Sequence, residues 1–118
     1  MGRLMVQSIP YIAKKDAICL VLLERARMGR TIYYSELGRL VGIPAQGPWK
    51  PILDLIGHEY EPDITYLVIN KQFRVPGQIG FTPAKPPTEE QKRRAREVIK
   101  AVFAKYKVRD PQGGGGEP

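Results

Sequence analysis

The chain has 118 residues, enough for one domain with a single modest hydrophobic core. Its net charge of +7 favours a polyanionic partner, such as DNA, RNA or an acidic protein surface. One cysteine and one histidine exclude an intrachain disulfide, a thiolate cluster and a histidine-based metal set, so we expect no metal and no cofactor.

The sequence has neither the pattern of a secretory signal nor that of a membrane span. The longest apolar run, AICLVLL at 17–23, is far shorter than the ~20 residues that cross a bilayer. We therefore expect a cytoplasmic protein without a membrane partner. Residues 1–109 are predicted to form one domain that opens with a short strand within residues 1–10, and the glycine-rich tail 110–118 is predicted to be disordered.

Apolar residues at steps of three and four predict a first helix over Tyr11–Met28, with Ala17 and Val21 on its inner face. Gly29 follows as a C-terminal cap, because glycine adopts the left-handed conformation at little cost. Cys19 lies within this apolar run, and we interpret it as a buried structural residue rather than a reactive thiol.

The stretch TIYYSELGRLVGIP predicts a short strand and then a short helix. Thr31–Tyr34 is rich in β-prone residues, and Ser35 is placed to cap a helix over Glu36–Val41. Gly42 ends this helix. The apolar residues of the helix are expected to face inward at helical spacing, namely Leu37, Leu40 and Val41.

A second helix is predicted over Pro48–Tyr60. Because Pro51 is tolerated only near a helix start, the first helical residue is expected at Trp49 or Lys50. His58 is interpreted as a surface residue at the helix end, since no nucleophile or second carboxylate stands nearby for acid–base chemistry. The expected buried stripe consists of Ile52, Leu55 and Ile56.

The next segment predicts a two-stranded hairpin. Asp63–Ile69 reads as a strand, Asn70–Gly77 as a polar turn, and Gln78–Phe81 as the returning strand. The proline-rich segment Thr82–Pro87 is expected to be extended and non-helical.

The last helix begins at Thr88, which forms a capping box with Gln91. Its apolar stripe consists of Ala95, Val98, Ile99, Val102, Phe103 and Tyr106. A basic face on the same helix consists of Lys92, Arg93, Arg96 and Lys100. This face is either a phosphate-contacting surface or a solvated face that is partly paired with nearby glutamates.

The order of these elements predicts a winged helix-turn-helix, an α+β fold that is mainly α, with a small β-hairpin wing and a C-terminal helix. In such a fold the last helix of the three-helix core enters the major groove, and the wing reaches the phosphate backbone. Cations stand where this geometry needs them, with Lys50 at the helix start, Lys71 and Arg74 in the hairpin turn, and Arg39 on the preceding helix.

TIYYSELGRLVGIP resembles the start of the DNA-binding domain of alkylguanine-DNA alkyltransferases and the related alkyltransferase-like proteins. TYLVINKQFRVPGQIGF resembles the segment that follows their alkyl acceptor, and the resemblance spans about residues 10–105. It implies a DNA-binding winged helix in which Tyr34 contacts and rotates a phosphate, and Lys50 stands near the place of an arginine that enters the base stack. Since side chains alternate along a strand, we predict that Tyr33 faces the core and Tyr34 faces outward.

The family's acceptor cysteine stands within Pro-Cys-His-Arg, where this chain has Ile64-Thr65-Tyr66-Leu67. A thiolate is the nucleophile in that reaction, so we expect no alkyl transfer and predict that the chain is not an enzyme. Alkyltransferase-like proteins that lack the cysteine still flip and sense bases, although lysine is a poorer stacking wedge than arginine.

These patterns predict a non-enzymatic protein that binds nucleic acid, double-stranded DNA above RNA, as a regulator or accessory of DNA transactions. The alternatives are a protein-binding adaptor or inhibitor of a nucleic-acid enzyme, acting through the basic last helix, and a base-lesion sensor. We expect a monomer or homodimer. For Trp49 we favour packing at the core edge over stacking on a base. The candidate nucleic-acid-binding residues are Tyr34, Ser35, Arg39, Gln46, Trp49, Lys50, Lys71, Arg74, Lys92 and Arg96.

Overall fold

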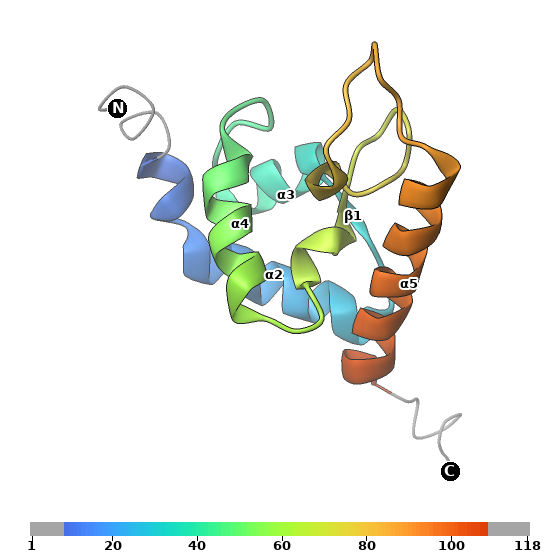
Figure 1. Ribbon diagram of the computed structural model, residues 1–118. Coiled ribbons are helices and arrows are strands. Elements are labelled where there is room, and N and C mark those ends of the chain that lie inside the picture. The colour runs from blue at the N-terminus through green and yellow to red at the C-terminus, as the bar shows by residue number, and fades with distance from the viewer. Residues whose placement is uncertain (1–8, 109–118) are drawn as a thin grey trace.

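A computed structural model describes residues 9–108 of the chain (Figure 1). Most of this part belongs to α2 (Lys15–Met28), α3 (Tyr34–Val41), α4 (Trp49–Glu59) and α5 (Glu89–Tyr106). A small parallel sheet accompanies them, which confirms the predicted α+β, mainly α, class. The tail 110–118 and nearly all of the strand predicted within residues 1–10 lie outside the described residues.

The short 3-10 helix η1 (Ile64–Leu67) lies at the centre of the fold (Figure 1). It contacts α2, α4 and α5, and the side chains of Ile64 and Leu67 are fully buried. α4 and α5 therefore lie on either side of η1, and α2 runs beneath it in this view. The largest side chains of the core come from all of these elements, among them Ile18, Leu22, Leu37, Ile52, Leu53 and Val102.

The first helix is interrupted near its start. Residues 9–12 form one helical turn, a turn follows at 13–14, and α2 begins at Lys15. Its end is as predicted, because Gly29 is left-handed with a φ of 69° and donates its N–H to the last turn. Cys19 is buried, as predicted, and this burial raises the pKa of its thiol.

The two strands pair differently from the predicted hairpin. β1 (Ile32–Tyr33) and β2 (Val68–Ile69) are parallel neighbours, with Ile32 opposite Val68. The predicted returning strand over Gln78–Phe81 is wrong, because the 3-10 helix η2 (Gly77–Ile79) occupies this segment. Only one antiparallel bridge joins the two limbs, at Ile69 and Pro76. Proline has no N–H to continue a ladder, which explains why the pairing stops there.

The predicted strand over Asp63–Ile69 is correct only at its end, since η1 replaces its first part. The Asp63 carboxylate accepts a hydrogen bond from the Thr65 backbone N–H at 2.8 Å, and so caps η1. The same carboxylate accepts the Thr65 hydroxyl at 2.5 Å. A local side-chain bond therefore favours a tight turn where β-propensity favours a strand.

Two inward-facing leucines were predicted wrongly. Leu40 and Leu55 are 49% and 43% exposed, whereas Leu53 is fully buried on α4. The buried stripe of α4 runs through Trp49, Ile52, Leu53 and Ile56, so the inner face is rotated relative to the predicted one. The predicted start of α4 is confirmed at Trp49.

The predicted start of the last helix is confirmed at the level of single hydrogen bonds. The Thr88 hydroxyl accepts the Gln91 N–H at 3.0 Å, and the Gln91 side chain accepts the Thr88 N–H at 2.9 Å. Ala95 and Val102 are buried, and the other apolar residues of the stripe pack against the core. Within residues 9–108, no helix has the length and apolar character needed to cross a bilayer.

Candidate nucleic-acid interface

The candidate interface is one end of the molecule, which we call the α3–α4 end. It consists of the outer face of α3, the loop 42–48, the first turn of α4 and the turn Asn70–Val75. In Figure 1 the loop 42–48 and the segment that follows β2 project at the same end, with α3 between them. Six of the ten predicted contact residues are exposed on these elements, namely Ser35, Arg39, Gln46, Lys50, Lys71 and Arg74.

An aromatic cluster beneath this surface fixes the loop 42–48. The ring of Trp49 makes edge-to-face contacts with Tyr11 at 5.0 Å and with Tyr34 at 5.8 Å between centroids. The indole N–H of Trp49 donates to the Ala45 carbonyl at 2.7 Å, and the Tyr11 hydroxyl donates to the Pro44 carbonyl at 2.8 Å. The loop is therefore held from below at two successive carbonyls.

This cluster decides between the two interpretations of Trp49. Trp49 is only 5% exposed and its single donor is already bonded, so it packs in the core rather than stacking on a base. Its inclusion among the nucleic-acid contacts was therefore wrong, and the favoured packing at the core edge is confirmed. Trp49 is buried at the first position of α4 because the residues that precede it fold back over its ring.

Tyr34 also differs from its prediction. Its side chain packs against the core, and burial raises the pKa of its hydroxyl to about 12. The expected outward orientation of Tyr34 is wrong because α3 begins at this residue, two residues earlier than predicted. Strand alternation no longer applies there, and Tyr34 lies on the helix face of Leu37 and Val41. Ser35 is consequently inside the helix, and no side chain caps α3.

The turn Asn70–Val75 carries two exposed cations, Lys71 and Arg74. The Asn70 N–H donates to the Val75 carbonyl at 2.8 Å, and the Asn70 carbonyl accepts the Arg74 N–H at 2.7 Å. Arg74 adopts a left-handed conformation with a φ of 57°. The Lys71 ammonium lies 5.6 Å from the ring centroid of Tyr33, which places this turn beside the start of α3.

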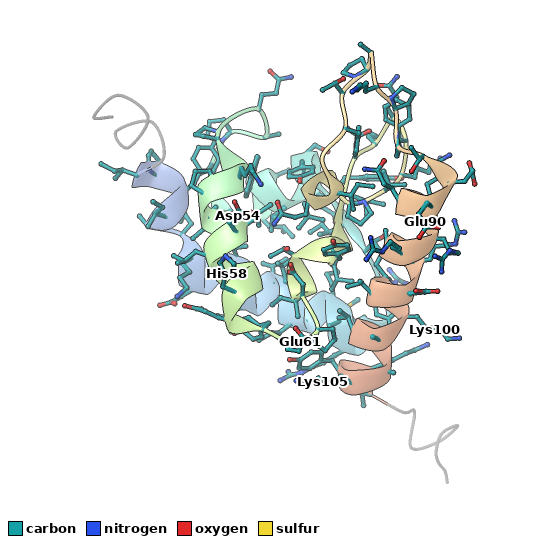
Figure 2. The ribbon with its side chains drawn as sticks, in the orientation of Figure 1. Asp54, His58, Glu61, Glu90, Lys100 and Lys105 are labelled. Atoms are coloured by element: carbon teal, nitrogen blue, oxygen red, sulfur yellow. The ribbon has the colours of Figure 1, made fainter. Side chains whose placement is uncertain are left out.

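Lys50 stands at the start of α4 with 75% of its side chain exposed. It forms an ion pair with Asp54 one turn later, at 3.2 Å. Gln78 donates to the same carboxylate at 3.2 Å, so Asp54 joins α4 to η2. Neither Asp54 nor Gln78 was predicted to belong to the site, and only their polar character in apolar surroundings could have indicated them. Figure 2 shows Asp54 and His58 along α4, below the α3–α4 end.

The structure separates the remaining two predicted residues from this surface. Lys92 and Arg96 lie on α5, which is across the molecule from α4 (Figure 1). Lys92 is half-buried and pairs with Glu89 at 3.3 Å, whereas Arg96 is exposed. The ten predicted residues therefore do not form one site.

Thr65 occupies the position at which the resemblance would place a nucleophile. It is completely buried, and its hydroxyl and its N–H are both bonded to Asp63. A substrate cannot reach this hydroxyl without local unfolding, so the geometry gives Thr65 a structural role. Among residues 9–108, no group of His, Cys, Asp and Glu side chains is arranged to hold a metal ion.

Comparison of the chain with protein-family models, with curated proteins and with solved structures finds no match.

Proposed function

We propose that the protein binds double-stranded DNA, without catalysis, through the α3–α4 end. The observation that carries this proposal is the position of Lys50, which is largely exposed at the start of α4 and lies at the same end of the molecule as three further exposed cations. Arg39 lies on α3, and Lys71 and Arg74 lie in the neighbouring turn. Phosphate contacts by such cations supply most of the non-specific affinity of a DNA-binding protein.

The same surface favours contacts with the phosphate backbone over base recognition. Beyond its first turn, the exposed side of α4 carries the carboxylates of Asp54 and Glu59. Carboxylates repel phosphates, so α4 would approach DNA with its first turn and not along its length. Two groups of aromatic rings nearby are already engaged in packing, namely the cluster around Trp49 and, in the turn Asn70–Val75, Phe73 against Phe81. We therefore expect affinity with little sequence specificity.

The turn Asn70–Val75 takes the place of a wing in this proposal. A winged helix needs a rigid projection beside its recognition helix, and the paired backbone bonds of this turn supply one without a regular hairpin. The likeness to alkyltransferase-like proteins is part of the same proposal, and sensing of a damaged base is its most specific form. Tyr34 as it lies here would not take part, because its hydroxyl is buried.

Fluorescence anisotropy with labelled duplex DNA of random sequence tests the proposal. We expect binding that is lost when Arg39, Lys50, Lys71 and Arg74 are all changed to Ala. The control changes the exposed Lys14 and Lys100, which lie on other surfaces, and should keep the affinity. Equal binding by the two variants would rule out the α3–α4 end. Duplexes that contain an alkylated guanine, and RNA duplexes, are compared in the same assay, and a preference for the former would identify a lesion sensor.

A further inference from the structure

A second concave surface lies on another side of the protein, between the end of α2 and α5. It is an open, shallow hollow of about 480 Å³, lined by Arg25, Gly29, Arg30, Thr31, Glu36 and Phe103. Its floor includes the partly exposed ring of Phe103, which packs against the core. Glu36 lies on α3 and the groove therefore borders the α3–α4 end, whereas the other lining residues lie outside that end. We call this surface the Phe103 groove.

The charges within the groove are unequal. Arg25 donates to the Glu36 carboxylate at 2.6 Å and to the Thr31 carbonyl at 3.1 Å, so the carboxylate is already matched by one cation. Arg30 is exposed at the rim and forms no ion pair within residues 9–108. The Lys107 side chain lies beside Gly29, next to Arg30 in the chain, where it would come within 3.0 Å of a methyl group added to Gly29.

The neighbouring face of α5 extends this charge. Arg96, Lys100 and Phe103 follow one another at steps of four and three residues, so they share one side of the helix axis, and Lys107 follows the last residue of the helix. Arg96 and Lys100 are exposed and form no ion pair within the described chain. Figure 2 shows Lys100 projecting from α5 on the side away from α4. Arg30 and Lys107 thus lie at the groove that Phe103 lines, and Arg96 and Lys100 lie further along α5.

We propose that the Phe103 groove binds an acidic peptide segment that carries one aromatic or large aliphatic side chain. The apolar side chain would lie on Phe103, and the carboxylates of the peptide would meet Arg30 and Lys107 at the rim and Arg96 and Lys100 along α5. Such a partner satisfies the complementarity of charge that guides protein association. This function uses a different surface from DNA binding and does not depend on it.

A peptide fits the groove better than a nucleic acid does. Glu36 and Thr31 line the groove as well as the cations, and each supplies an oxygen acceptor that also bonds Arg25. A peptide backbone brings N–H donors for these acceptors, whereas a phosphodiester backbone brings only acceptors. The volume accommodates one or two side chains and is too small for a duplex.

Titration with labelled synthetic peptides tests the proposal on the full chain. The probe peptide alternates glutamate with serine around one central phenylalanine. Its two controls replace either every glutamate by glutamine or the phenylalanine by serine. We expect the acidic aromatic peptide to bind about tenfold more tightly than either control. The charge-reversal variant Arg30→Glu with Lys100→Glu should lose this preference, and the variant Lys14→Glu with Lys85→Glu should keep it, because both of its positions are exposed outside the groove.

Each remaining outcome overturns the proposal. Equal affinity of the probe for both charge-reversal variants would show that the peptide binds elsewhere. If the parent protein binds no peptide, and the variant Arg30→Glu with Lys100→Glu binds single-stranded or duplex DNA more weakly than the parent does, the groove is a nucleic-acid site. Circular dichroism of each variant checks that the fold is retained. Failure of duplex binding by the Arg39, Lys50, Lys71 and Arg74 variant concerns the other surface and leaves this result unaffected.

Discussion

The hydroxyl of Tyr34 lies against the α-carbon of Gly77. A methyl group added at Gly77 would come within 2.9 Å of two carbons of the tyrosine ring, and closer still to its oxygen. This contact joins the start of α3 to η2, and Gln78 in turn bonds Asp54 on α4. The absence of a side chain at Gly77 therefore permits the segment after β2 to close over both helices of the candidate interface.

Gly77→Ala should destabilise the protein by about 1–3 kcal/mol, because the added methyl group overpacks a contact with a stiff ring. Denaturant unfolding followed by circular dichroism measures the change. Gln72→Ala, at an exposed position in the preceding turn, is the matched control and should alter stability little. Equal stability of the two variants would mean that the ring of Tyr34 moves away freely.

Stability should fall in alkaline solution in a way that depends on Tyr34. Burial raises the pKa of its hydroxyl from 10.0 to about 12, so the folded state favours the neutral form. The unfolded chain ionises first, and the stabilisation present below pH 10 is lost as the pH rises toward 12, by at most about 1.4 kcal/mol per pH unit.

Tyr34→Phe should remove this dependence. Within the described residues the hydroxyl makes no hydrogen bond, so the variant is expected to match the parent near pH 7 and to be more stable at high pH. Unfolding curves of both proteins at several pH values provide the comparison. If the two proteins lost stability in parallel at high pH, the buried hydroxyl of Tyr34 would not be the cause of the loss.

The ion pair Arg25–Glu36 should make a small contribution to the stability of the fold, and this contribution should be lost in acid. The hydrogen bond from Arg25 lowers the pKa of the Glu36 carboxyl, so the folded state favours the charged form. This stabilisation is present above the unfolded pKa and is lost as the pH falls through the folded pKa. Glu36→Gln is expected to cost about 1 kcal/mol near neutral pH and nothing in strong acid. Glu97→Gln, at an exposed ion pair on α5, serves as the control.

Asp63→Ala should be among the most damaging single changes outside the apolar core. It leaves the N–H and the hydroxyl of the fully buried Thr65 without a partner, which costs about 1–3 kcal/mol for an unsatisfied buried group. The double variant Asp63→Ala with Thr65→Val removes the hydroxyl as well and should recover part of the loss. Thermal unfolding of the two variants measures this recovery, and its absence would show that Asp63 stabilises η1 in another way.

The salt dependence of DNA binding should reflect the number of cations at the α3–α4 end that contact phosphates. Four phosphate contacts predict a slope of about −3.6 for log K against log salt concentration. Each single change among Arg39, Lys50, Lys71 and Arg74 to Ala should reduce the slope by about 1. Anisotropy titrations at several salt concentrations give the slopes. A change in affinity without a change in slope would mean that the residue does not contact a phosphate.

Sequence patterns predicted the elements that depend on local signals. The capping box at Thr88, the left-handed Gly29 and the start of α4 all follow from residues within one turn of each other. The region around residues 63–81 was predicted less well, because its structure depends on partners distant in the chain. β-propensity in Asp63–Ile69 could not show that β2 would pair with β1, or that Asp63 would form a tighter turn.

The candidate site was predicted only in part, because some of its features also depend on partners distant in the chain. Exposed cations such as Lys50 and Arg74 follow from polar patterns and short loops. The orientation of Tyr34 depended on a two-residue shift in the start of α3, since the inward direction differs between a strand and a helix. The basic surface of the α3–α4 end could not be distinguished from that of α5 on the sequence alone, because the sequence does not show that α5 lies across the molecule from α4.

The central position of η1 has a consequence for how the chain matures. Its residues are synthesised after α2 and α4, yet these two helices have their common packing partner only once Ile64–Leu67 is synthesised. A nascent chain that ends before this point would expose to water the parts of α2 and α4 that pack on η1. Acquisition of the native state is therefore a late, all-or-none event, and a fragment truncated ahead of residue 64 would be a target for chaperones and proteases.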